Sequence, residues 1–173
     1  PVGVEENFLG VIDLVRQRAL LYKDETLGAE FEIADIPAEL VDSAREAREK
    51  MIESACEADD KLMEKYLEGE ALTEDEILLA LRKATIQAKL VPVLVGSAFK
   101  NKGVQPLLDA VVDFLPAPTD VPAIVGTVPG SSERVERPSS DDAPFSALIF
   151  KIMTDPYVGQ LAFFRVYSGV LES

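Results

Sequence analysis

Several acidic residues stand side by side in the sequence, at spacings that could support acid–base or metal chemistry. The groups are Asp59 with Asp60, and Glu74 with Asp75 and Glu76. Each group opens a run with helical periodicity, and carboxylates at a helix start are favoured by the helix dipole alone. We therefore predict that these carboxylates sit at helix starts, and we assign no catalytic residue and no metal ligand.

Histidine is absent from the sequence, and there is a single cysteine. Ser-His-Asp triads, Cys-His dyads and histidine-based metal sites are therefore excluded for this chain. Cys56 falls among Ala, Met and Ile at helical spacing, so we interpret it as a small core residue rather than a nucleophile. One cysteine cannot form an internal disulfide, and it suits a reducing, cytoplasmic environment.

A loop of small residues, Gly96 to Gly103, follows the apolar run Leu90-Val-Pro-Val-Leu-Val95. The run has the length and composition of a buried strand. Helical periodicity then predicts a helix with an apolar stripe at Leu107, Leu108, Val111, Val112 and Leu115. In α/β sheets, ligands bind where a strand ends at such a loop, because backbone N–H groups are left unpaired there. A small-molecule site is therefore expected at residues 96–103.

The chain is strongly acidic, since 31 Asp and Glu residues against 17 Lys and Arg residues give a formal net charge of −14. Nucleic-acid affinity depends largely on neutralising phosphates, so we expect no direct DNA binding and no main RNA contact from this segment. A basic protein surface is the better-matched partner. No apolar run approaches the ~18 residues that a membrane span needs, so no membrane partner is expected.

Carboxylates concentrate on one face of a helix that we expect over residues 38–58. The apolar face of this helix, at ~100° per residue, comprises Leu40, Ala44, Ala47, Met51 and Ala55. The opposite face comprises Glu39, Asp42, Glu46, Glu49, Glu53 and Glu57. Pairs between Arg45 and Glu49 and between Glu46 and Lys50 should offset part of the repulsion. Two interpretations stay open, a solvated acidic face and a docking ridge for a basic partner.

The other elements of the first part follow from periodicity and turn residues. Residues 8–22 predict one long strand or two short ones, pairing antiparallel with a strand at 30–34 across a turn that begins Lys23-Asp-Glu-Thr. A short helix is expected at 59–68, and Thr73-Glu-Asp-Glu76 is a capping box that opens a further helix. The buried stripe of that helix should comprise Ile77, Leu78, Leu81, Ala84 and Ala88.

Antiparallel β structure is predicted after a Pro-rich connector, so we place a domain boundary near residues 116–124. Residues 127–143, rich in Gly, Pro and Ser, predict a loop around a short hairpin. Two strands are expected at 145–153 and 161–167. A lone hairpin is marginally stable, so this last part is expected to be the start of a longer β domain.

The loop Gly96-Ser-Ala-Phe-Lys-Asn-Lys-Gly-Val-Gln105 resembles the last guanine-contacting motif of translational GTPases. Further blocks that match bacterial-type elongation factor G, in that family's order, are Gly10–Val15, Glu64–Glu70, Leu108–Pro116, Phe150–Gly159 and Arg165–Gly169. The resemblance covers essentially the whole chain. It implies an α/β fold in three parts. Residues 1–89 would be a helical and β-hairpin insertion subdomain, 90–116 the last strand and helix of a P-loop GTPase domain, and 117–173 a linker and the truncated start of a β-barrel.

The resemblance also implies which residues contact the nucleotide. The Ser97 side chain would stabilise the loop, and the N–H groups of Ala98 and Phe99 would meet the base oxygen of guanine. Such a donor accepts guanine and rejects adenine, whose amino group would leave the donor unpaired. The parent protein would be a cytoplasmic GTPase that uses GTP, GDP and magnesium and binds the ribosome to drive translocation of tRNA and mRNA.

The chain departs from the family in the parts that perform catalysis. It lacks the Gly-x-x-x-x-Gly-Lys-Ser/Thr phosphate loop and the Asp-x-x-Gly switch segment, and Val104 stands where an Asn-Lys-x-Asp motif starting at Asn101 would need aspartate. With no initiator Met, it is expected to be an internal fragment that is inactive alone.

The resemblance implies a second role, in which the insertion subdomain contacts the basic C-terminal domain of the ribosomal stalk protein. Its docking residues would be Asp42, Glu46, Glu49 and Glu53. The alternative is an independent acidic protein-interaction module unrelated to translation.

Overall fold

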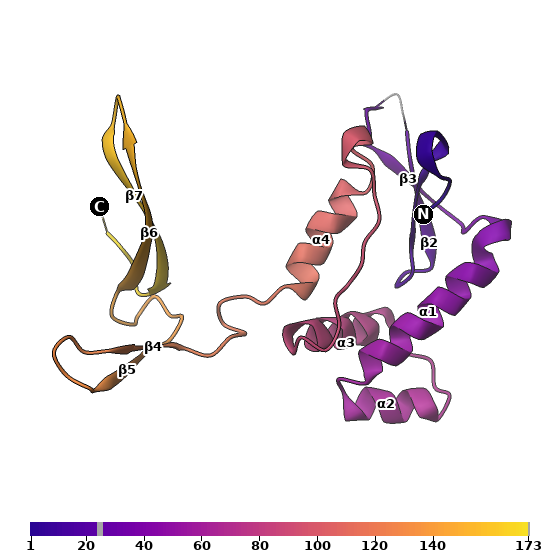
Figure 1. Ribbon diagram of the computed structural model, residues 1–173. Helices are drawn as coiled ribbons and strands as arrows, with labels where there is room; N and C mark the ends of the chain where they lie inside the picture. Colours follow the sequence, from indigo (N-terminus) through magenta and orange to yellow (C-terminus); the bar gives the residue numbers. More distant parts are fainter. Residues whose placement is uncertain (24–25, 173) are drawn as a thin grey trace. The chain divides into compact units, whose positions relative to one another are not determined.

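The computed structural model describes residues 1–23 and 26–172, which form two compact units, Pro1–Leu115 and Pro116–Ser173 (Figure 1). Over these residues the fold is mixed α/β, with antiparallel strands and four α-helices. The α/β class predicted from the sequence is confirmed at this level. Within the described ranges, no helix combines the length and the apolar character that crossing a membrane requires.

A three-stranded antiparallel meander opens the first unit, after a 3-10 turn, η1 (Glu5–Asn7). Its strands, in sheet order, are β1 (Gly10–Asp13), β2 (Arg18–Tyr22) and β3 (Phe31–Ala34). Residues 8–22 thus contain two short strands, and β2 pairs with β3 as predicted. The predicted turn includes Asp24 and Glu25, which lie outside the described residues. Phe8, Val11, Leu20 and Tyr22 form a small core on this meander.

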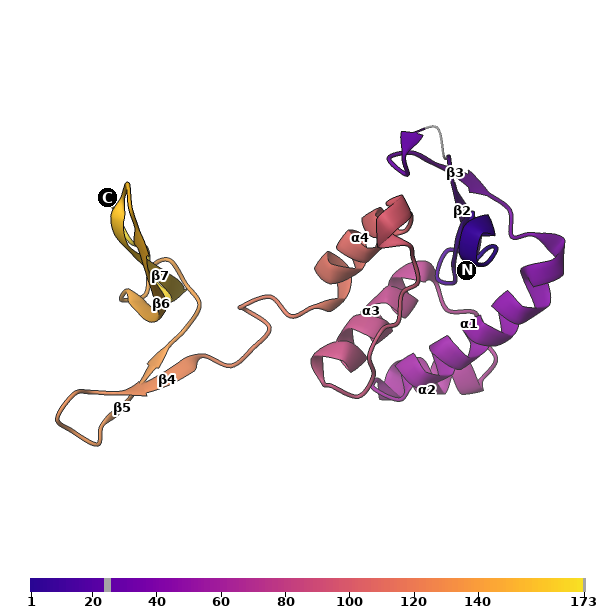
Figure 2. The ribbon, with the colours of Figure 1, turned by 45° about the horizontal axis from the view of Figure 1, so that its top comes forward.

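Helices form most of the rest of the first unit. They are the 3-10 turn η3 (Ala38–Leu40), α1 (Val41–Cys56), α2 (Asp60–Leu67), α3 (Glu74–Ile86), the 3-10 turn η4 (Ala98–Lys100) and α4 (Val104–Phe114). Helix α3 contacts both α1 and α4 (Figure 2). The main core lies among these helices and comprises Val15, Ala55, Ile77, Ala80, Leu81, Ala110 and Phe114.

The ends of α3 illustrate how local chemistry sets helix length. The Thr73 hydroxyl accepts the Glu76 N–H at 3.3 Å, and the Glu76 carboxylate accepts the Thr73 N–H at 2.8 Å, so the predicted capping box is confirmed. The helix ends at Ile86, and Ala88 beyond it is exposed with a φ of +55°. The prediction that Ala88 belongs to the buried stripe is therefore wrong, because the stripe stops with the helix.

The apolar run Leu90–Val95 is extended, but it is not the buried strand that its composition predicts. It pairs with no strand among the described residues, and Val91 and Val93 are 83% and 86% exposed. A strand of this composition is buried by neighbours on both sides. The sheets described here are antiparallel and use other segments, so no strand stands beside this run.

Helix α4 has the predicted period, but most of its large apolar side chains are exposed. Its buried residues are Ala110 and Phe114. The predicted stripe, all of it exposed, comprises Leu107, Leu108, Val111, Val112 and Leu115. These side chains are left exposed because the side of α4 that contains Ala110 packs against the core cluster of the first unit.

Two antiparallel hairpins make up the second unit. The first pairs β4 (Ile124–Thr127) with β5 (Arg134–Arg137), and the second pairs β6 (Ser146–Asp155) with β7 (Gly159–Ser168). The Asp155 carboxylate accepts the N–H groups of Tyr157 and Val158 at 2.8 and 2.9 Å, which fixes the turn between β6 and β7. The strands predicted at 145–153 and 161–167 are confirmed.

Candidate functional site

The loop between residues 96 and 103 is closed by its own main chain. The Ser97 N–H donates to the Lys102 carbonyl at 2.8 Å, and the Lys102 N–H donates back to the Ser97 carbonyl at 3.0 Å. Asn101 and Gly103 adopt left-handed conformations with φ of +54° and +88°. A side chain at Gly103 would stand 3.0 Å from the Val95 carbonyl oxygen, so glycine is needed where the loop returns to its start.

The three residues predicted to contact guanine are consecutive at the exposed end of this loop. The N–H groups of Ala98 and Phe99 make no hydrogen bond within the described part of the chain, and the Phe99 side chain is fully exposed. Ser97 is half-buried and closes the loop through its main chain; its side chain does not cap η4. Adjacent unpaired donors of this kind can hydrogen-bond a carbonyl oxygen of a ligand.

Two lysines of the loop bind main-chain carbonyls near the start of the chain. Lys102 is only 2% exposed, and its Nζ donates to the Phe8 carbonyl at 3.0 Å. Lys100 Nζ donates to the Glu6 carbonyl at 2.8 Å. Asn101-Lys102 resembles the start of a guanine-specific motif, but in this structure the lysine is buried and has a structural role.

Gln105, in the first turn of α4, fastens the loop to a second segment. Its side-chain N–H group donates to the carbonyls of Gly28 and Ala29, at 3.2 Å each. These anchors could not be predicted from the sequence, because their acceptors are main-chain carbonyls 76 or more residues away. No local pattern in the sequence signals such a contact.

All six carboxylates of the predicted acidic face are exposed on η3, α1 and the residue after it; they are Glu39, Asp42, Glu46, Glu49, Glu53 and Glu57. Lys50 Nζ lies 2.6 Å from the Glu46 carboxylate, and this hydrogen bond lowers the Glu46 pKa. Arg45 pairs with Asp42 at 3.1 Å rather than with Glu49 as predicted, because the guanidinium reaches back one turn. Glu49 and Glu53 have no ion pair in the described ranges, so the face stays negative.

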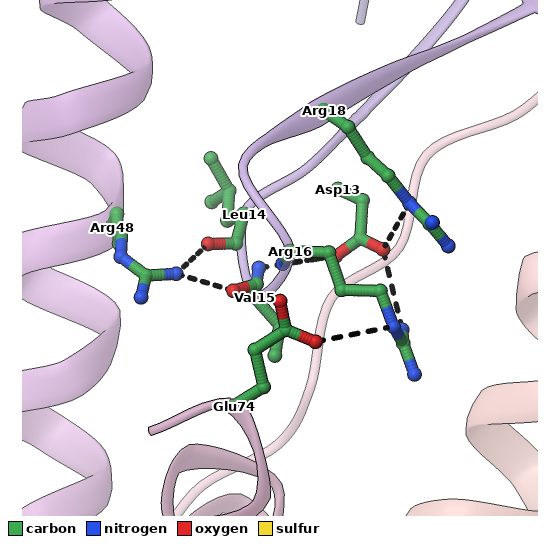
Figure 3. Close-up of polar contacts among 7 residues, drawn as sticks. All are labelled: Asp13, Leu14, Val15, Arg16, Arg18, Arg48 and Glu74. Carbon is green, nitrogen blue, oxygen red and sulfur yellow. Dashed lines mark hydrogen bonds and ion pairs between the residues drawn. The ribbon is translucent and has the colours of Figure 1, made fainter. Parts of the chain in front are cut away.

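Asp13 organises the turn between β1 and β2. Its carboxylate accepts the N–H groups of Val15 and Arg16 at 3.1 and 3.0 Å, and it pairs with the side chains of Arg16 and Arg18 at 3.3 and 3.7 Å (Figure 3). Arg16 also approaches Glu74 of α3 at 3.9 Å. In this cluster the acidic and basic side chains pair with one another and join the meander to α3.

Arg48 turns away from the acidic face and joins α1 to the same turn. Its guanidinium donates to the carbonyls of Leu14 and Val15, the latter at 2.6 Å (Figure 3). The acidic face is therefore not neutralised by this arginine.

The neighbouring carboxylates have the helix-start roles predicted for them. Asp59 accepts the N–H groups of Lys61 and Leu62 at the start of α2, and Lys83 donates to it at 2.8 Å. That hydrogen bond is the main cause of the lowered Asp59 pKa. Among the described residues, no group of three or more Cys, Asp or Glu side chains could hold a metal ion.

Cys56 lies in the core of the first unit. It is 1% exposed, and burial is the main cause that raises its thiol pKa. A raised pKa keeps the thiol protonated and unreactive at neutral pH. The interpretation of Cys56 as a core residue is confirmed.

The Glu76 carboxyl gives the fold a pH dependence. Its pKa is lowered from 4.5 to about 2, chiefly by the hydrogen bond from Lys65 and then by the Thr73 N–H. Because the folded state favours the carboxylate, its stabilisation is complete above pH 4.5 and is lost as the pH falls toward 2. In Glu76→Gln, the urea concentration at the midpoint of unfolding should fall less steeply between pH 4.5 and pH 2 than in the wild type. Glu64→Gln on α2, at an exposed carboxylate, is the control; equal slopes in both variants and in the wild type would contradict the prediction.

These observations define a mixed α/β chain with a closed, exposed loop before α4 as its candidate ligand site. No family model matches the chain. Among solved structures, the crystal structure of ttk003000868 from Thermus thermophilus is similar to it, with a TM-score of 0.73 and 28% sequence identity. The match covers 98% of this chain and 22% of that chain, so the chain spans less than a quarter of the length of the protein that it resembles.

Proposed function

We propose that this chain is a segment of a translational GTPase of the elongation factor G type. Residues 1–89 would be its insertion subdomain, 90–116 the end of its GTPase domain and 117–173 the start of its β-barrel domain. Two findings support the proposal. The sequence blocks occur in the family's order, and almost the whole chain matches a structure whose own chain is much longer.

The observation that carries the proposal is the pair of N–H groups at Ala98 and Phe99, which have no hydrogen-bond partner in the part of the chain that the structure describes. The loop that presents them is held in one shape by the two hydrogen bonds between Ser97 and Lys102. Preformed donors aimed at a carbonyl favour guanine over adenine. The chain would then supply one wall of the base pocket, and the groups that hold the phosphates and magnesium would come from elsewhere in the parent protein.

Exposed apolar surface beside this loop supports the same assignment. A groove of about 790 Å³ is lined by Val91–Val95, by the apolar side of α1 and by Ala110 and Phe114 of α4. Unpaired extended backbone with apolar side chains is a template for a further strand. In the proposed parent, the rest of the GTPase sheet would cover it.

Proline substitution tests the proposed base contact in the intact protein that contains this chain. Ala98→Pro removes one donor at the first position of η4, where proline is tolerated. We expect guanine nucleotide affinity to fall about 10-fold, and discrimination against adenine to weaken, in fluorescence titrations. Ala38→Pro is the matched control, because Ala38 is the first residue of η3 and lies outside the loop.

Two outcomes would contradict this proposal. If the intact wild-type protein does not bind guanine nucleotides, the proposed function is wrong. The isolated chain should bind neither GTP nor GDP, since it has no phosphate loop. Micromolar, guanine-specific binding by the chain alone in calorimetry would therefore show that the site is assembled differently.

A second candidate function, docking of a basic protein domain, is favoured by the exposed acidic face of α1. We propose that Asp42, Glu46, Glu49 and Glu53 steer and dock the basic C-terminal domain of the ribosomal stalk protein. Charges at such a surface affect the association rate more than the affinity, and salt screens them.

Charge reversal on this face has a measurable consequence. Changing Glu46 and Glu49 together to lysine should slow association with the purified stalk domain at low salt by about 10-fold or more. The matched control reverses Glu133 and Glu136, which are exposed in the second unit. If stopped-flow association rates are unchanged in the first variant, or equally reduced in both, the acidic face is a solvated surface and not a docking site.

A further inference from the structure

The loop that presents Ala98 and Phe99 takes its position from a distant part of the chain. Side chains at the end of the loop and the start of α4 donate to main-chain carbonyls of η1, the residue after it and the segment before β3. The acceptors lie 76 to 95 residues earlier in the sequence. The segments on either side of β1 and β2 thus hold the loop in place through hydrogen bonds.

Close packing at Gly28 makes this attachment rigid. Its backbone has a φ of +76°, and a Cβ atom there would stand only 2.5 Å from the Asn101 carbonyl oxygen and 2.6 Å from that of Lys100. Two stretches of main chain are therefore in direct contact. A shift of the segment before β3 would push the loop with it.

At this junction the structural contribution of Gln105 is its side-chain N–H group, which donates hydrogen bonds. Its Nε2 bridges two carbonyls, whereas its Oε1 is buried with no hydrogen-bond partner among the described residues. A buried acceptor left unpaired costs free energy, so the amide is not placed here for its oxygen. Lys102, buried with its ammonium on the Phe8 carbonyl, makes the equivalent contact to the other segment.

We infer that Lys102 and Gln105 are positioning residues for guanine recognition, and that they make the β-meander the support on which the base-contacting loop is held. The inference rests on the proposed function, because it assumes that Ala98 and Phe99 meet a guanine base. It adds that the affinity for guanine is set partly by the segments 5–8 and 28–29, whose carbonyls accept the hydrogen bonds that hold the loop.

Gln105→Glu tests this role with little change of shape, since it replaces the donating Nε2 by an oxygen facing two carbonyls. In the 173-residue chain we expect lower heteronuclear NOE values at residues 98–101, which report faster local motion. In the intact protein we expect guanine nucleotide affinity to fall about 2- to 30-fold. Gln105→Lys, which returns a donor, should recover part of both losses.

The matched control is Gln87→Glu, which changes an exposed glutamine just after α3. A second test variant, Lys100→Met, removes an exposed anchor and leaves the anchors Lys102 and Gln105 in place. Gln87→Glu should behave as the wild type, and Lys100→Met should loosen the loop in the same direction as Gln105→Glu. Unchanged loop motion in both anchor variants, or an equal affinity loss in Gln87→Glu, would overturn the positioning role. If the wild-type protein binds no guanine nucleotide, the proposed function fails instead.

Discussion

Replacing Gly28 with alanine is expected to lower the free energy of unfolding of the first unit by about 2–5 kcal/mol. The left-handed conformation at this position, with φ of +76°, accounts for part of the loss. The larger part comes from the new methyl group, which would press on the carbonyls of Lys100 and Asn101. These carbonyls cannot retreat freely, because the hydrogen bonds between Ser97 and Lys102 close the loop around them.

Gly69 offers a control that separates strain from contact. Its φ is +77°, almost the same as at Gly28, but a Cβ atom there would have no neighbour within 4 Å. Gly69→Ala should therefore cost only about 1–2 kcal/mol. Urea unfolding followed by helical circular dichroism measures both, since the α-helices of the described ranges all lie in Pro1–Leu115. Equal losses in the two variants would show that the contact with the loop contributes nothing.

Elements whose signals are local could be predicted from the sequence. Thr73 and Glu76 stand at the spacing of a capping box, and they form one. The two long strands of the second unit are mostly apolar segments on either side of an Asp-Pro-Tyr turn, and they pair with each other. In these places the residues that decide the conformation are a few positions apart, so propensity and hydrogen bonding agree without help from the rest of the fold.

Burial could not be predicted in the same way. Most of the apolar run Leu90–Val95 and the stripe of α4 from Leu107 to Leu115 have the composition of a core, but they are exposed. An apolar pattern indicates that a surface is suited to burial, and it does not say which element covers it. The described residues contain no strand that pairs with the run.

One part of the candidate site could be predicted from the sequence, and the other part could not. The loop and its Ser97-Ala98-Phe99 residues could be located from their place between an apolar run and a helix. The supports of the loop could not, because Lys102 and Gln105 act on carbonyls that any residue type would offer. A sequence pattern carries information about side chains, so contacts to distant main chain leave no trace in it.

The core of the first unit should depend on Ile77 more than on any other residue of α3. Ile77 is 1% exposed and packs in the cluster that joins α3 to α1 and α4. Ile77→Ala should lower the free energy of unfolding by about 2–5 kcal/mol, since it removes buried methyl groups and leaves a cavity. Leu79→Ala on the same helix is the control, because Leu79 is 59% exposed and its loss should stay within about 0.5 kcal/mol.

The same pair of variants also shows whether the core supports the loop. Ala110 and Phe114 of α4 belong to the cluster that contains Ile77, and Gln105 stands in the first turn of that helix. If α4 loosens in Ile77→Ala, hydrogen exchange of its amides should quicken, and the hydrogen bonds from Gln105 should weaken with it. Faster exchange in α4 for Ile77→Ala, and not for Leu79→Ala, is therefore expected. Equal exchange in the two would mean that α4 is held mainly by its attachment to the meander.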